Sequence, residues 1–125
     1  MVKHKDSGFT LLELLLVLVI LGLLAGLAAP VVSKSVLRSK EAALKENLQV
    51  LRAALDDFYA DKGVYPSSPE ELVENRYIRF IPEDPIHGET EWNWEEDDNF
   101  DIEGLIDVHS YSNKESLSGT FYSEW

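Results

Sequence analysis

The feature that most constrains this chain is an uninterrupted apolar run near its N-terminus. From Leu14 to Val32 no residue carries a charge. A run of this length is about what an α-helix needs to cross the hydrocarbon core of a bilayer. Lys3 and Lys5 precede the run, and basic residues favour the cytoplasmic side. We therefore expect a single-pass membrane helix with a cytoplasmic N-terminus and with the residues after about Ser33 on the opposite side.

Length and charge leave room for one small domain beyond this segment. The chain has 125 residues and a formal net charge of -12, and after Phe80 its only basic residue is Lys114. Binding to phosphates requires clustered Lys and Arg, so nucleic acid is excluded as a partner. The chain has no cysteine, which excludes disulfides, thiolate metal sites and cysteine nucleophiles.

One carboxylate, that of Glu13, lies at the start of the apolar segment. An unpaired carboxylate at this depth costs roughly 2.5 to 3.5 kcal/mol on insertion scales. A stable protein is therefore expected to supply a partner for it. Glu13 closes the string Gly8-Phe9-Thr10-Leu11-Leu12-Glu13, in which a glycine and an aromatic residue precede the acid and the apolar run follows.

This string resembles the prepilin signature of type IV pilins and type II secretion pseudopilins. The resemblance implies that a prepilin peptidase cuts between Gly8 and Phe9 and methylates the new N-terminus at Phe9. The α-amino group released by the cut is cationic near neutral pH and is the expected partner for Glu13 of a neighbouring subunit. The alternative is a generic single-pass anchor with a chance Gly-Phe pair.

The same resemblance gives roles to Gly22 and Pro30, which match positions where family members loosen the helix in the assembled filament. Gly22 and Gly26 also form a G-x-x-x-G pair, which allows close helix packing in lipid. Pro30 lacks the N–H that its helical turn would use.

Beyond the apolar run, a stripe of apolar residues predicts that the helix continues. The stripe recurs at steps of three, four and seven, and its members are Leu37, Leu44, Leu48, Leu51, Leu55 and Phe58. Charged residues such as Arg52 lie mainly off this face. We expect one helix from Thr10 to about Asp61 whose stripe packs on the chain's own sheet, with Gly63 ending it and Pro66 preventing its resumption.

The remaining sequence predicts a short helix and a sheet. Ser68 to Glu71 has the pattern of a capping box with Pro69 at the first helical position, and Asp84 is expected to cap a turn. Alternating residues predict strands over 91–94, 100–108 and 120–125. Trp92, Trp94, Phe100 and Ile102 are expected to form the hairpin face that covers the long helix, with 95–99 as its turn.

The stretch from Phe58 to Pro66 resembles the helix-to-loop junction of G-type (major) pseudopilins. The resemblance implies an α+β fold of lollipop shape: a long N-terminal helix, membrane-spanning and then amphipathic, packed on a small C-terminal antiparallel β-sheet. We expect a leader at 1–8 that is removed, a transmembrane and assembly helix at 9–32 and a periplasmic domain at 33–125. In this domain the helix should reach about residue 61, a loop and short helix should follow over 62–90, and the sheet over 91–125.

No catalytic or cofactor site is predicted. His4, His87 and His109 show no metal or triad spacing, and no serine stands in a nucleophile-elbow context. The acidic residues of 97–103 fail the calcium-binding EF-hand template, because Ile102 and Val108 occupy its glycine and glutamate positions. Major pseudopilins bind calcium in the loop that here spans 110–119. Asn113 and Ser118 stand there where aspartates are usual, so we expect little calcium binding.

These features predict a structural protein, a pseudopilin, which is not an enzyme. The resemblance implies that it polymerises with itself and other pseudopilins into a periplasmic fibre that drives type II secretion. Its further partners would be the prepilin peptidase and methyltransferase and an assembly platform of the bacterial inner membrane. The alternatives are a major or minor pilin of a surface type IV pilus and, in a different class, a monomeric membrane-tethered binding module with an acidic hairpin.

Overall fold

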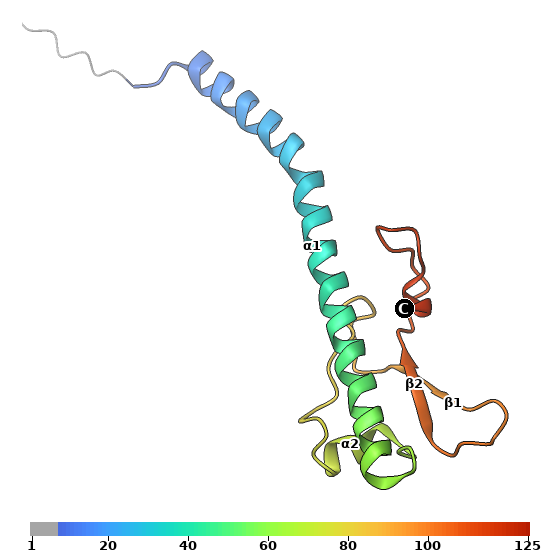
Figure 1. The fold of residues 1–125 in the computed structure, drawn as a ribbon. Helices are drawn as coiled ribbons and strands as arrows, with labels where there is room; N and C mark the ends of the chain where they lie inside the picture. Colours follow the sequence, from blue (N-terminus) through green and yellow to red (C-terminus); the bar gives the residue numbers. More distant parts are fainter. Residues whose placement is uncertain (1–7) are drawn as a thin grey trace, which may run out of the picture. The chain divides into compact units, whose positions relative to one another are not determined.

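The computed structural model describes residues 8–125. It contains the long helix α1 (Leu11–Lys62), the short helix α2 (Pro69–Glu74), the strands β1 (Asn93–Glu96) and β2 (Leu105–His109) and the final 3-10 turn η1 (Tyr122–Glu124) (Figure 1). This is the predicted α+β architecture, with a long N-terminal helix and a small antiparallel sheet. The described chain forms two compact units, one ending at Leu37 and one spanning Arg38–Trp125, and α1 runs through both.

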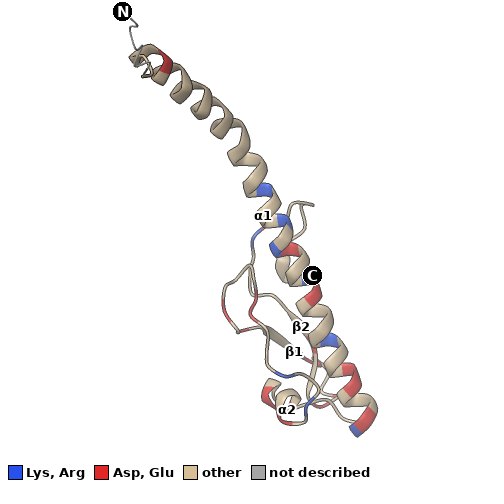
Figure 2. Cartoon of the chain, turned by 90° about the vertical axis from the view of Figure 1, so that its left-hand side faces the viewer, with Lys and Arg blue, Asp and Glu red and all other residues tan. Residues whose placement is uncertain are grey.

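The second half of α1 supplies one wall of the core. Side chains one helical turn apart share a face, and this face is buried at Leu44, Leu48, Leu51, Leu55 and Phe58. The predicted stripe is thus confirmed from Leu44 onward. Charged residues are spread along this half of the helix (Figure 2).

Two adjoining clusters make up the core. In the first, Leu44, Leu48 and Leu51 pack with Trp92, Val108 and Tyr122. In the second, Ala54, Leu55 and Phe58 pack with Leu72 and Leu105. Both clusters join α1 to the sheet, as expected for an amphipathic helix that buries its apolar stripe on its own domain.

Helix α1 ends at a glycine in the left-handed conformation. Gly63 has φ +71° and donates its N–H to the Tyr59 carbonyl oxygen at 2.8 Å, which closes the last turn as predicted. A second glycine, Gly104, precedes β2 with φ +103°. A Cβ there would lie 2.7 Å from the Tyr65 carbonyl oxygen, so only glycine fits this close approach.

The sheet is a two-stranded antiparallel ribbon. In its register Trp94 faces Val108 and Glu95 faces Asp107, with an irregularity between Glu95 and Glu96. Because successive side chains alternate between faces, Val108 turns to the core while Asp107 and His109 share the opposite face with Glu95.

The predicted sheet is too large in two places. Residues 97–104 form a loop, not a strand, because the Asp97 carboxylate accepts bonds from the backbone N–H groups of Asn99, Asp101 and Ile102 at 3.1–3.3 Å. Phe100, expected to cover α1, is 87% exposed with φ 56°. Trp92 and Trp94 do pack on the core as expected.

The predicted third strand over 120–125 is also wrong. Its only ladder contact is the isolated bridge between Glu115 and Phe121, and η1 follows. A side-chain hydrogen bond favours the 3-10 turn over an extended strand, because Trp125 Nε1 donates to Thr120 Oγ1 at 2.8 Å.

Helix α2 starts at Pro69 as predicted, but its capping differs. The Ser68 side chain makes no cap bond. The Glu71 carboxylate instead reaches one residue further back, where it accepts from the Ser67 hydroxyl and, at 3.4 Å, from the Ser67 backbone N–H.

Asp84 is the fully buried centre of the loop before β1. One carboxylate oxygen accepts from the backbone N–H groups of Ile86 at 2.9 Å and His87 at 3.0 Å. The other accepts from the Ser110 hydroxyl just after β2, and the Ser110 oxygen accepts in turn from the Ser112 N–H at 3.1 Å. The predicted turn cap is confirmed, and it also ties the loop to the end of the sheet.

The last residues are attached to α1 at two places. The Glu41 carboxylate accepts from the Tyr122 hydroxyl at 2.7 Å and from the Leu117 N–H at 2.8 Å. Further along the helix, Arg52 Nη2 donates to the main-chain oxygen of Trp125 at 2.6 Å. Burial and the neighbouring Glu41 carboxylate raise the pKa of Tyr122 to about 12.

Candidate processing and assembly site

The predicted cleavage site lies immediately before α1. Gly8 and Phe9 are exposed and precede the first helical residue, Leu11. No other part of the described chain lies within 4 Å of a Cβ built on Gly8, and Phe9 is 85% exposed. The peptide bond between them is therefore open to a protease. Residues 1–7 of the predicted leader lie outside the described residues.

Thr10, predicted as the first residue of the helix, lies immediately before α1 and caps it, a role that was not predicted. Its hydroxyl accepts from the Glu13 backbone N–H at 3.2 Å, and its carbonyl oxygen accepts from the Leu14 N–H at 3.1 Å. A threonine three residues before a glutamate is a known N-terminal pattern, so the signal was present in the sequence.

Glu13 lies in the first turn of α1. The helix N-terminus carries partial positive charge, which stabilises a carboxylate there by about 0.3 to 1 kcal/mol. This is less than the roughly 2.5 to 3.5 kcal/mol that the carboxylate costs in the apolar layer. Within the described chain, residues 8–125, no salt bridge offsets the remainder.

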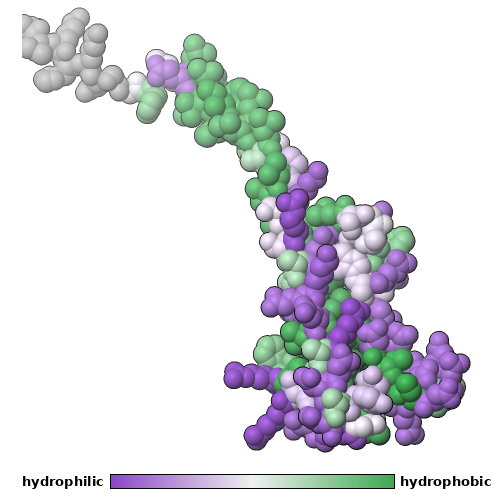
Figure 3. Space-filling model, viewed as in Figure 1, coloured by the Kyte–Doolittle hydropathy of each residue, from purple (hydrophilic) through white to green (hydrophobic). Residues whose placement is uncertain are grey.

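The residues after Glu13 form an apolar surface with nothing packed on it. Every residue from Leu11 to Val36 is exposed, and the first part of α1 is continuously hydrophobic in Figure 3. Among the described residues, α1 is the one helix long and apolar enough to cross a membrane. Such a surface needs lipid or another apolar helix around it.

Gly22, Gly26 and Pro30 are spaced by four residues within the unbroken α1. They therefore lie on one face of the helix. Pro30 has no N–H, so the carbonyl oxygen of Gly26 lacks its intrahelical donor. Gly22 and Gly26 have open space around them, which leaves room for close approach of a second helix.

The loop expected to hold calcium in major pseudopilins has few free acidic ligands in this chain. The hydroxyls of Ser116, Ser118 and Thr120 bond to one another at 2.9, 3.0 and 3.3 Å. Asn113 is exposed, and Glu115 is the one carboxylate between Ser110 and Gly119. Calcium needs six to eight oxygen ligands, usually with several carboxylates, and the loop has its hydroxyls already paired.

One arrangement was not foreseen from spacing. His109, which had no metal-type partner in the sequence, lies beside Glu95 and Asp107 in the sheet, with their ligand atoms within 4.8 Å of one another. Arg52, expected to lie mainly off the packed face of α1, donates from Nε to Asp107 Oδ1 and from Nη2 to the Val108 carbonyl oxygen, both at 2.9 Å. Only the fold brings these groups together, because 55 residues separate Arg52 from Asp107.

Comparison with known proteins gives three consistent results. Residues 3–29 match the family model described as the prokaryotic N-terminal methylation motif. The chain is 33% identical over 101 residues to type II secretion system core protein G of Pseudomonas aeruginosa, covering 68% of this chain and 71% of that protein. It is 31% identical over 101 residues to the core protein G of Aeromonas hydrophila, with the same two coverages of 68% and 71%.

A third relative matches over a shorter stretch. The type IV major pilin protein PilA of Myxococcus xanthus is 38% identical over 68 residues, which cover 54% of this chain and 31% of the pilin. No solved structure matches the chain significantly.

Proposed function

Because the chain belongs to the family of type II secretion system core protein G, we propose that it is a pseudopilin that polymerises into a periplasmic fibre serving protein secretion. The apolar helix anchors the subunit in the inner membrane, and prepilin peptidase processes it. With Lys3 and Lys5 on the cytoplasmic side, the domain from Ser33 onward lies in the periplasm. The further partners are other pseudopilins and an assembly platform in the inner membrane.

The observation that carries this proposal is the first half of α1. An exposed apolar surface from Leu11 to Val36 and one carboxylate in its first turn are poorly suited to a monomer. Lipid can cover the surface, but lipid gives Glu13 no counter-charge. A monomeric tethered binding module leaves this cost of about 2 kcal/mol uncompensated.

Cleavage supplies the missing cation. Removal of residues 1–8 places a charged amine on Phe9, only four residues from Glu13. Within one chain the amine lies at the same helix end, whose partial charge is also positive. In a fibre of staggered helices, the amine of one subunit approaches the Glu13 carboxylate of the next, so that insertion in the membrane itself favours the polymer.

The extent of similarity favours the pseudopilin over the surface pilin. The match to the P. aeruginosa core protein G covers 71% of that protein, whereas the match to the M. xanthus pilin covers 31% of the pilin. The match to core protein G also covers a larger share of this chain, 68%, than the match to the pilin, 54%.

Glu13→Leu tests the role of the carboxylate. The variant removes both the cost of insertion and the ion pair, so it should insert, be cleaved after Gly8 and fold normally, yet enter fibres poorly. Glu46→Leu is the matched control, since Glu46 is an exposed residue of the same helix beyond the apolar segment. Crosslinking between subunits and electron microscopy of overexpressed fibres measure incorporation. Normal fibres from Glu13→Leu would show that apolar packing is sufficient and that the acid has another role.

A further inference from the structure

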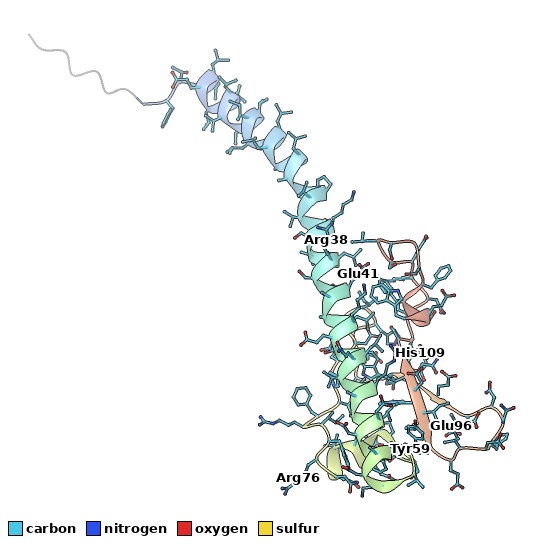
Figure 4. All side chains as sticks on the ribbon, in the orientation of Figure 1. Arg38, Glu41, Tyr59, Arg76, Glu96 and His109 are labelled. Carbon is cyan, nitrogen blue, oxygen red and sulfur yellow. The ribbon has the colours of Figure 1, made fainter. Side chains whose placement is uncertain are left out.

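The strongest unexplained feature lies on the face of the sheet turned away from the core, outside the assembly helix. Glu95 and Asp107 are directly opposite each other in the register of β1 and β2, and His109 follows two residues after Asp107. Two like charges directly opposite in a sheet destabilise it unless a cation lies between them. Figure 4 shows His109 on β2 among the side chains of this sheet.

The ring of His109 has a fixed orientation. Its Nδ1 lies 2.8 Å from the main-chain oxygen of Trp125, which can only accept, so Nδ1 carries a hydrogen. In the neutral imidazole, Nε2 then presents a lone pair. Nε2 lies 3.0 Å from Glu95 Oε2 and 3.5 Å from Asp107 Oδ2, and both oxygens can only accept, so the contact needs either a hydrogen on Nε2 or a metal ion between this lone pair and the two carboxylates.

Asp107 is held in the same manner. Its Oδ1 accepts from Arg52 Nε at 2.9 Å and from the Val108 N–H at 2.8 Å, which leaves Oδ2 directed toward His109. Metal-binding histidines and carboxylates typically have their second polar atom anchored in this way by an outer group. Here the outer groups are the main-chain oxygen of Trp125 for His109, and Arg52 with a backbone N–H for Asp107.

The spacing of the three atoms fits a tetrahedral ion. Ligands at about 2.1 Å from Zn²⁺ lie about 3.4 Å from one another in tetrahedral geometry. The distances from His109 Nε2 to the two carboxylate oxygens are 3.0 and 3.5 Å, and all three atoms lie within 4.8 Å of one another. A small side-chain adjustment would bring them into coordination.

The surroundings favour a cation as well. Glu95 and His109 line a hollow of about 470 Å³ together with Glu96, Asp97 and Asp98, so its charge is strongly negative. This surplus of acid offsets the nearby Arg52. Glu95 is about half exposed, and the ion would keep a coordination position for water on this side.

We propose that Glu95, Asp107 and His109 form a binding site for a divalent transition metal of the Zn²⁺ type. Imidazole nitrogen with carboxylate oxygens suits Zn²⁺, whereas Ca²⁺ prefers oxygen ligands alone. Because His109 and Arg52 both bond to the main-chain oxygen of Trp125, an ion at this site stabilises the attachment of the last residues to α1. The site goes beyond the proposed structural function and does not depend on it.

Zinc titration of the full chain in detergent, prepared without a polyhistidine tag, tests the site. Calorimetry should show one Zn²⁺ per chain, and Zn²⁺ at a hundredfold excess over its dissociation constant should raise Tm by about 10 °C or more. Ca²⁺ at the same concentration should give no such shift at this site.

Variants connect the binding to these residues. His109→Gln and Glu95→Gln should each weaken Zn²⁺ binding by about tenfold or more. Glu91→Gln is the matched control, because it removes the same charge from an exposed position that belongs neither to the cluster nor to the lining of the hollow. The His109 side chain is less exposed than that of Glu95, so its variant could fail to fold. In that case Glu95→Gln still tests the site.

Two results would overturn the proposal. Absence of Zn²⁺ binding would show that a proton on His109 is the cation between the carboxylates, as an ion pair. Binding that survives both Glu95→Gln and His109→Gln would place the metal elsewhere in the chain.

Discussion

Replacing Asp84 by alanine is expected to cause a large loss of stability. The side chain is fully buried and accepts from two backbone N–H groups and one hydroxyl. A buried donor left without its partner costs about 1 to 3 kcal/mol. With two such donors fixed in the backbone, and Ser110 able to rotate, we expect a loss of about 3 kcal/mol or more, a large part of the stability of a small domain.

Urea unfolding of the full chain in detergent measures this loss. All three tryptophans lie between Trp92 and Trp125, so their fluorescence reports on the second unit alone. With an m value of about 1.5 kcal/mol/M, a loss of 3 kcal/mol lowers the midpoint by about 2 M. Asp84→Asn retains the volume and one accepting oxygen, so its loss should be smaller, about 1 to 2 kcal/mol.

Asp98→Ala serves as the control, because Asp98 is exposed in the loop between β1 and β2. Its effect should stay within about 0.5 kcal/mol. A loss below about 1 kcal/mol for Asp84→Ala would refute the reasoning. It would mean that the backbone bonds of the loop, such as the one from the Gly88 N–H to the Asp84 carbonyl oxygen at 2.7 Å, suffice without the carboxylate.

Three further predictions concern processing, pH and calcium. Mass spectrometry of the native protein should find N-methyl-Phe9, and Gly8→Val should block cleavage by crowding the exposed site, whereas an intact Met1 in cells with prepilin peptidase would contradict the motif. Stability should fall as pH rises from about 10 to about 12, because folded Tyr122 keeps a proton that the unfolded chain has lost. Tyrosinate absorbance of wild type and Glu41→Gln should show a lower pKa for Tyr122 in the variant, and equal values would exclude a role for the Glu41 charge. Calcium should raise Tm little. A chelator-sensitive gain of about 2.7 kcal/mol in the free energy of unfolding, at a hundredfold excess of calcium over its dissociation constant, would show that amide and main-chain oxygens are sufficient ligands for the ion.

Periodicity made the helical parts of the fold predictable. The stripe from Leu44 to Phe58, the stop at Gly63 and the start at Pro69 depend on neighbours within one or two turns, and the structure agrees at each. The strands were less predictable, because alternation alone does not show that the Asp97 carboxylate will bind three backbone N–H groups and fold the residues after it into a loop. Phe100 therefore lies in solvent although its pattern indicated a core residue.

The two candidate sites also differ in whether local sequence alone could predict them. Gly8, Phe9 and Glu13 are adjacent in sequence, so a local motif could identify them, although their roles stay predictions. Glu95, Asp107 and His109 become neighbours only through the register of β1 and β2, and Arg52 reaches them from α1. No local pattern contains this information, since pairing between distant segments is fixed by the whole core.

The two attachments of the last residues to α1 have a mechanical consequence. Glu41 and Arg52 are 11 positions apart in the numbering, so about 16 Å of helix lies between them. A segment fastened at two points that far apart can neither slide along the helix nor pivot about a single bond. Part of any tension applied along α1 is therefore carried by the segment from Leu117 to Trp125. This segment stiffens the stretch of helix between Glu41 and Arg52.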